Sequence, residues 1–236
     1  MGWRSGYRTI SIMQIVLAAI IFASLPMWKK SVSETAESEK PTGIAAALKI
    51  KGVPLALLLF FGYCSLESTA GIWASSYFAS FKGADPETAA KLASVFYIGI
   101  TSGRFLSGII ADKAGDRTLI RTGFSVILPG LILTAIPSEG IWLSAAGLIL
   151  IGLGCAPIYP AMIHAVPTNF GKECSQSIIG IQMASAYVGT TFMPPLFGII
   201  AENVSLGCYP FYMLIFLILM ITASETLNKT VDKNIS

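Results

Sequence analysis

Long uncharged, apolar stretches recur along the chain and are separated by shorter polar segments. Their lengths predict seven helices, at residues 9–28, 53–80, 91–111, 122–137, 141–165, 177–200 and 209–227. A helix needs about 20 apolar residues to cross the hydrocarbon core of a bilayer. The pattern therefore predicts an all-α polytopic membrane protein with seven transmembrane helices.

One polar segment is much longer than the others. Residues 29–52 carry five lysines and three glutamates with few large apolar side chains, a composition typical of a solvated linker. We therefore expect a single transmembrane helix within residues 1–28, a cytoplasmic linker at 29–52, a six-helix half-bundle at 53–228 and a cytoplasmic tail at 229–236.

Composition supports the membrane assignment. Of the 236 residues, 54% are hydrophobic and 12% are charged, whereas soluble domains carry about 25% charged residues. A net charge of +3 argues against a nucleic-acid partner. The four cysteines are widely spaced and there is one histidine, so we expect no metal site and no cofactor.

The distribution of positive charge predicts the orientation. If the linker is cytoplasmic, eleven of the sixteen lysines and arginines lie inside, four lie outside and Arg104 lies within a helix. By the positive-inside rule, the N-terminus is then outside and the C-terminus is cytoplasmic. We expect an integral protein of the cytoplasmic membrane.

A distinctive run of residues begins near the end of the third predicted helix and continues into the loop after it: Gly108, Asp112, Lys113, Gly115 and Arg117. A glycine at 108 permits close approach of another helix, and one at 115 permits a tight turn. The run resembles the G-x-x-x-D-[RK]-x-G-x-[RK] loop of the major facilitator superfamily, which joins the second and third helices of each half. Asp116 departs from the usual pattern. The resemblance implies a gating loop, which includes Arg104 on the same helix; a topological anchor is the alternative.

The resemblance to this superfamily extends over essentially the whole chain. Segments 67–77, 152–160 with 167–171, and 182–189 resemble the seventh, tenth and eleventh helices of the sugar permeases of the fucose–proton symporter group. The resemblance implies that residues 53–228 are a C-terminal half-bundle. The helix before them is then expected to be the last helix of a missing N-terminal half.

Glu67 and Arg104 are the acid and the base placed deep within predicted helices. At about 1.5 Å per residue, Glu67 lies about 21 Å and Arg104 about 12 Å from the cytoplasmic boundary. This mismatch of about 9 Å argues against a direct salt bridge, so we expect Arg104 to extend toward the cytoplasm. Glu67 is expected to bind substrate or couple a proton, or else to be a structural acid.

Other candidates lie on helix faces that helical spacing defines. Tyr97 and Thr101 share a face with Arg104 and Gly108, which either lines a cavity or packs. Gln182 and Ser185 share another face with Gly189; these groups suit a neutral polyol and are equally common in helix packing.

Aromatic residues and prolines add further hypotheses. Trp73, Tyr77 and Tyr159 are candidates for a sugar-stacking platform, with packing as the alternative. We interpret His164 as structural. The prolines at 157, 160, 167, 194 and 195 are expected to interrupt two helices and supply either hinges or static kinks.

These observations favour a secondary transporter that moves a small solute, with a sugar as the candidate, by proton-coupled alternating access. Its expected partners are the solute, a proton, membrane lipid, and the missing N-terminal half or a partner chain. An inactive truncated or split-gene fragment is the main alternative, and efflux of a hydrophobic compound is a weaker one. A seven-helix receptor does not explain residues 108–117, and an enzyme would need a nucleophile–base pair or metal cluster that the sequence does not present.

Overall fold

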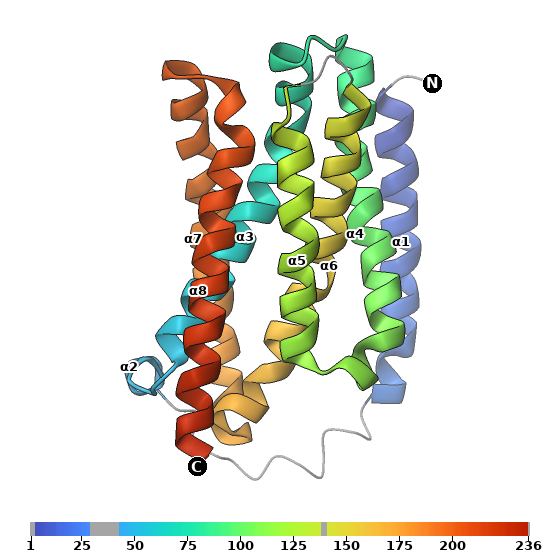
Figure 1. Ribbon diagram of the computed structural model, residues 1–236. Coiled ribbons are helices and arrows are strands. Elements are labelled where there is room, and N and C mark those ends of the chain that lie inside the picture. Colours follow the sequence, from blue (N-terminus) through green and yellow to red (C-terminus); the bar gives the residue numbers. More distant parts are fainter. Residues whose placement is uncertain (1–2, 29–42, 138–140, 236) are drawn as a thin grey trace. The chain divides into compact units, whose positions relative to one another are not determined.

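The computed structural model describes residues 3–28, 43–137 and 141–235. Over these ranges every regular element is helical, and seven helices are long and apolar enough to cross a membrane. This confirms the predicted all-α transmembrane class. The chain forms two compact units, Met1–Lys40 and Pro41–Ser236. The helix of the first unit is α1 (Trp3–Trp28), drawn in blue in Figure 1.

The second unit is a bundle of six long helices that run alternately up and down (Figure 1). They are α3 (Val53–Ser76), α4 (Pro86–Ala114), α5 (Asp116–Ala135), α6 (Ile141–Phe170), α7 (Lys172–Asn203) and α8 (Tyr209–Ile235). A short helix, α2 (Ile44–Leu48), precedes them. A π-helical turn, η1 (Tyr77–Phe81), continues α3, and a 3₁₀ turn, η2 (Leu206–Cys208), leads into α8.

Most of these helices extend beyond the apolar stretches that predicted them, and a polar cap or a glycine marks several of their ends. Asp85 accepts a hydrogen bond from the Thr88 N–H at 3.0 Å and starts α4, with Pro86 in the first helical position. Gly115 (φ 73°) separates α4 from α5, and Gly171 (φ 86°) separates α6 from α7. We call the end of the bundle that carries both glycine turns the Gly115 end; α8 also finishes there (Figure 1).

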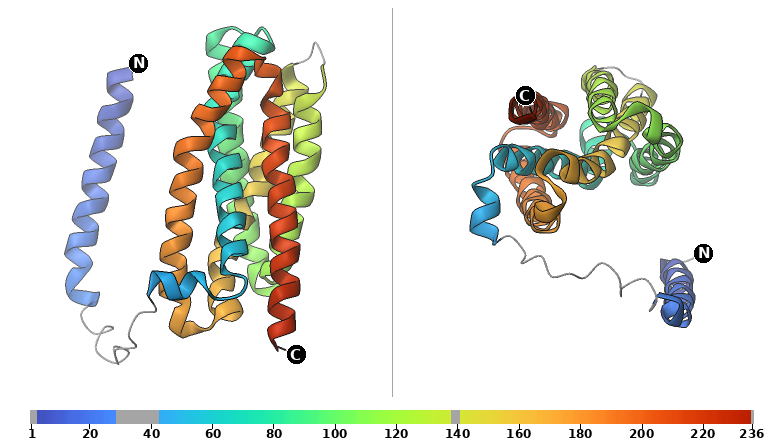
Figure 2. Two further views of the ribbon diagram at one scale, coloured as in Figure 1. Left: turned by 90° about the vertical axis from the view of Figure 1, so that its left-hand side faces the viewer. Right: turned by 90° about the horizontal axis from the view of Figure 1, so that it is seen from below.

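The six helices pack as two groups of three. Helix α6 packs against α4 and α5, while α3 packs against α7 and α8 (Figure 2). Contacts of α5 with α8, α3 with α4 and α6 with α7 join the groups. The largest buried side chains come from α3, η1 and their neighbours: Phe60, Tyr63, Tyr77, Phe78, Phe96, Phe197 and Tyr209.

Glycines allow α6 to lie very close to its two neighbours. A Cβ added at Gly152 would clash with the backbone carbonyl of Phe96 on α4. One added at Gly154 would lie 2.6 Å from the carbonyl oxygen of Gly123 on α5. Helix association within a membrane depends on such close packing, because lipid supplies no hydrophobic driving force between helices.

The structure corrects three expectations from the sequence. Helices α6 and α7 are continuous through all five prolines, so these prolines do not interrupt them. Helix α8 continues to Ile235, so most of the expected tail extends the last helix. The end of the expected linker contains α2, whose Ala47 is fully buried, whereas residues 29–42 lie outside the described ranges.

Candidate functional site

Glu67 and Arg104 form an ion pair in the middle of the bundle. A guanidinium nitrogen of Arg104 on α4 lies 3.8 Å from Glu67 Oε1 on α3. The Glu67 side chain is 26% exposed and that of Arg104 is 57% exposed, so the carboxylate sits deeper. The expectation that the two residues lie at depths too different for a direct salt bridge is wrong.

The cause is the direction in which helical side chains lean. Each Cα–Cβ bond tilts toward the N-terminus of its own helix. Helix α3 begins at the Gly115 end and α4 runs down toward that end (Figure 1). The Glu67 side chain therefore leans toward the Gly115 end while that of Arg104 leans away from it, and the two meet. Counting the rise per residue compares only Cα positions and does not include the direction in which the side chains lean.

Arg104 belongs to an exposed face of α4. Tyr97 and Thr101 lie on the same exposed face, as helical spacing predicts, and Gly108 continues it toward the Gly115 end. The Tyr97 side chain is 56% exposed. The hydroxyl of Thr101 donates to the Tyr97 carbonyl oxygen at 2.8 Å and can still accept a hydrogen bond.

A cavity of about 770 Å³ is lined by Arg104 of this pair but not by Glu67. Its walls come from α4, the start of α5 and the proline-rich part of α6: Arg104, Ser107, Gly108, Ala111, Gly115, Asp116, Leu119, Pro157, Tyr159, Pro160, Ala161 and His164. Volumes of about 300–1,000 Å³ are usual for small-molecule sites. A cation in the wall of a cavity that is otherwise largely apolar, apart from the Asp116 and His164 side chains, can orient a polar solute.

Tyr159 is the aromatic candidate that the structure places in this cavity. Its ring centroid lies 5.1 Å from that of Phe60 and 6.0 Å from that of Tyr63, both on α3. Its hydroxyl contacts the Met183 sulfur at 3.5 Å. These neighbours hold the ring between α3 and α6, and its partly exposed surface faces the cavity.

The other aromatic candidates serve helix packing. The Trp73 indole N–H donates to the Pro194 carbonyl oxygen at 2.9 Å, and the Trp73 ring meets Phe197 edge-on. The Tyr77 hydroxyl donates to the carbonyl oxygen of Thr134 at 2.7 Å. Both tie α3 and its extension to other helices, so neither belongs to the Arg104 cavity.

Gln182 and Ser185 also lie away from the Arg104 cavity. The Ser185 hydroxyl donates to the Leu57 carbonyl oxygen on α3 at 2.9 Å. This bond between helices fits the alternative that Ser185 serves helix packing. Gln182 is 2% exposed and lines a different cavity. The glycine on the same face, Gly189, lies against the backbone of α3 at Phe61.

The residues of the expected gating loop have distinct surroundings. Leaving aside the neighbouring backbone of α4 itself, no described atom of the six-helix bundle comes within 4 Å of a Cβ added at Gly108, so no other helix of the bundle packs closely there. Lys113 is exposed, and Gly115 has the positive φ that a tight turn requires. The side chain of Asp112 lies outside the described part of the structure.

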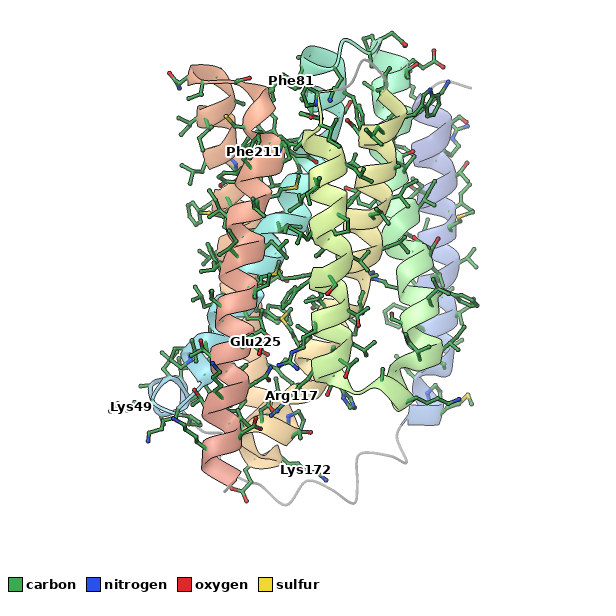
Figure 3. The ribbon with its side chains drawn as sticks, viewed as in Figure 1. Lys49, Phe81, Arg117, Lys172, Phe211 and Glu225 are labelled. Atoms are coloured by element: carbon green, nitrogen blue, oxygen red, sulfur yellow. The ribbon has the colours of Figure 1, made fainter. Side chains whose placement is uncertain are left out.

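Arg117 takes part in a contact that sequence reasoning missed. Its two terminal nitrogens donate to both carboxylate oxygens of Asp232 on α8, at 3.0 and 2.7 Å. One turn later, Arg121 makes a second two-point bond with Glu225, with both distances 2.7 Å. Figure 3 shows Arg117 and Glu225 near the Gly115 end, on α5 and α8.

Asp116, the departure from the family pattern, has a specific partner. Its carboxylate lies 2.9 Å from Nδ1 of His164 on α6. The pair joins the start of α5 to α6 at the edge of the Arg104 cavity. Helical spacing could not indicate this contact, because the residues belong to different helices.

Comparisons with known proteins agree with this fold. A family model described as the Major Facilitator Superfamily matches residues 55–227. No curated protein sequence matches the chain. Among solved structures, the fold is similar to that in the crystal structure of a Major Facilitator Superfamily transporter, FucP, in the outward conformation, with a TM-score of 0.69 and 12% sequence identity.

The structural match covers 81% of this chain and 47% of the FucP chain, so this chain spans about half the length of that transporter. At this identity the similarity concerns the fold. Among the described residues, no group of three His, Cys, Asp or Glu side chains is arranged to hold a metal ion.

Proposed function

This chain belongs to the Major Facilitator Superfamily, and from that premise we propose that its six-helix bundle is one wall of a secondary transporter for a small neutral solute, with a sugar as the first candidate. Family and fold are those of membrane transporters rather than enzymes. The observation that carries the proposal is the Glu67–Arg104 pair beside the 770 Å³ cavity.

Charged side chains are costly within a membrane and commonly mark substrate or ion pathways. Here the Arg104 side chain is 57% exposed on the open face of α4 and lines the cavity. At 3.8 Å the pair is longer than a strong charge-assisted hydrogen bond of about 2.8 Å, which leaves the Arg104 guanidinium able to donate to a solute hydroxyl. Tyr97, Thr101 and Tyr159 supply an aromatic and hydroxyl surface around it.

The chemistry of Glu67 supports the proposal of proton coupling. A protonated Glu67 no longer attracts Arg104, and the guanidinium is then free to change its contacts. Loading of a proton and rearrangement of the cavity wall are thereby linked. We propose that Glu67 is the proton-coupling acid within this bundle and that Arg104 responds to its charge.

We further propose that the open face of α4 is covered by a second six-helix half, in the same chain or in a partner. The 47% coverage of FucP and the exposed Tyr97, Phe105 and Ile109 support this. The Gly115 end is proposed to be cytoplasmic, because Lys113, Arg117, Arg121 and Lys172 gather there. An inactive fragment is the alternative for the chain by itself.

The experiment is uptake of radiolabelled L-fucose into proteoliposomes that contain the full chain under an imposed proton gradient. We expect Glu67→Gln to reduce gradient-driven uptake at least about tenfold, the effect of losing about 1.4 kcal/mol. Glu87→Gln is the matched control, since Glu87 is 78% exposed and bonds to Lys91 on its own helix. Uptake that survives Glu67→Gln contradicts the assigned role, and no uptake by the wild-type chain favours the fragment alternative.

A further inference from the structure

The bond between Asp116 and His164 lies where two cavities meet. Asp116 lines the Arg104 cavity and also a second cavity of about 310 Å³, and it is the one described residue that lines both. Helix α6 also contributes to both walls, through His164 on one side and Thr168 on the other. The first turn of α5 and the facing part of α6 therefore divide the two cavities.

The first turn of α5 has room to move. Apart from the adjoining residues, nothing described lies within 4 Å of a Cβ added at Gly115, which precedes this turn. The backbones of α5 and α6 come very close only two turns farther along α5, at Gly123 and Gly154. Toward the Gly115 end, the Asp116–His164 bond joins the two helices, with a cavity on either side of it.

The same part of α5 is also attached to α8. Arg117 makes its two-point bond with Asp232, and Arg121 makes another with Glu225. Arginine and carboxylate side chains ordinarily keep their charges from about pH 5 to about pH 8, whereas histidine ordinarily gains a proton in this range. The attachment to α6 therefore depends on pH in a way that the attachment to α8 does not.

The geometry of the pair suits a response to protons. Nδ1 of His164 lies 2.9 and 3.1 Å from the two carboxylate oxygens of Asp116. The His164 side chain is 82% exposed, so protons reach it from solvent, whereas the Asp116 side chain is 21% exposed. Protonation places a positive charge beside the carboxylate, and charge-assisted hydrogen bonds are about twice as strong as neutral ones.

The neighbouring charged groups do not titrate in the same range. Besides the pair, the titratable side chains in the walls of the two cavities are Arg104, Arg117 and Tyr159. Lys113, near the end of α4, is exposed. Arginine, lysine and tyrosine ordinarily ionise well above pH 8. His164 is therefore the group in these walls whose charge changes near neutral pH.

We propose that the Asp116–His164 pair is a proton-binding site, distinct from Glu67, that controls the separation of α5 from α6 at the Gly115 end. With His164 protonated, the first turn of α5 is held against α6 and the two cavities stay divided. With His164 neutral, the bond weakens, the turn remains with α8 through Arg117, and the cavities join. Acid at this end then slows solute release, a consequence that rests on the proposed function; the movement itself does not.

The first measurement is the titration of His164. It is the one histidine among the 236 residues, so NMR of the histidine-labelled full chain, purified without a histidine tag, gives a single ring signal. We expect this signal to titrate between about pH 5 and about pH 8. A signal that does not change over this range overturns the proposal.

The second measurement is the separation of the two helices. Spin labels at Thr118→Cys on α5 and Thr168→Cys on α6, both exposed positions, report it by electron paramagnetic resonance in lipid nanodiscs. Cys174→Ser and Cys208→Ser remove the two native thiols that are not buried. From about pH 5.5 to about pH 8 we expect the ratio of separated to closed populations to rise about fivefold, as the charge-assisted bond is lost. A ratio that does not change overturns the proposal.

Variants assign the change to the pair. His164→Gln and Asp116→Asn should each remove the pH dependence of the separation, while the histidine signal of Asp116→Asn still titrates. Glu67→Gln is the control and should keep the pH dependence. Loss in Glu67→Gln with retention in His164→Gln assigns the response to Glu67, which overturns this proposal and supports the proton-coupling role of Glu67. Retention in Asp116→Asn shows that the bond does not control the separation and also overturns it.

Discussion

The direction in which each side chain leans from its helix brings Glu67 and Arg104 together. Their Cα positions follow from the helical rise, but their meeting depends on the antiparallel course of α3 and α4. Hydrogen bonds of single side chains also explain why Trp73, Tyr77 and Ser185 lie outside the Arg104 cavity. Each donates a hydrogen bond to a backbone carbonyl of another helix and is thereby committed to packing.

The hydroxyl of Tyr77 gives a test of such packing bonds. Tyr77 is 1% exposed and bonds to the Thr134 carbonyl oxygen. Tyr77→Phe should lower the free energy of unfolding by about 1 kcal/mol, the usual net value of one hydrogen bond. Tyr187→Phe at a 70% exposed position is the control and should change it little. Denaturant titration in micelles measures both, and equal effects would contradict the packing role.

The hydrogen bonds of Asp85 lead us to predict that the stability of the folded protein depends on pH. Its hydrogen bonds with Thr88 hold the pKa of the Asp85 carboxyl below its usual range. A lowered pKa in the folded state means that the stabilisation is present above the unfolded-state pKa and is lost as pH falls through the folded-state pKa. Asp85→Asn keeps a capping oxygen without titrating, so its thermal midpoint should fall less than that of wild type between about pH 6 and about pH 3. Identical pH profiles would contradict this.

At the scale of the element, glycine contacts set how closely α6 approaches α4. Gly152→Ala would drive a methyl group into the Phe96 carbonyl, so α4 and α6 must separate. We expect a loss of about 1–3 kcal/mol in unfolding free energy, typical of overpacking. Gly180→Ala is the matched control on α7, since nothing lies within 4 Å of its added Cβ. A neutral Gly152→Ala would show that the two helices are farther apart than described.

The elements themselves could be predicted from the apolar pattern, because membrane helices need long uncharged stretches. Their ends could not, because Asp85 and Gly115 act through capping and turn geometry that hydropathy does not record. Continuity through Pro157 and Pro194 was also missed, since neighbouring helices and side chains can compensate for the lost backbone bonds within a membrane.

Many residues of the candidate site could be anticipated from the sequence, but the side chains on other helices that they bond to could not. Arg104 and Glu67 stand out as charges within apolar stretches, and helical spacing placed Tyr97 and Thr101 beside Arg104. The bonds of Arg117 with Asp232 and of Asp116 with His164 join different helices, and no local pattern predicts which helices will be neighbours.

At the scale of the whole molecule, the proposed orientation can be tested by cysteine labelling in intact cells. Lys91→Cys lies at the end opposite the Gly115 turn and should react with a membrane-impermeant maleimide. Lys113→Cys should react only after the cells are permeabilised. The wild-type chain, with its four cysteines, measures the background. The reverse pattern would invert the proposed topology.

The central claim is that Glu67 and Arg104 act as one unit in transport. A double-mutant cycle on gradient-driven L-fucose uptake tests it most directly, with Glu67→Gln, Arg104→Gln and the double variant compared with wild type. We predict that the double variant loses no more activity than the more damaged single variant. Effects of the two substitutions that multiply independently would contradict the claim.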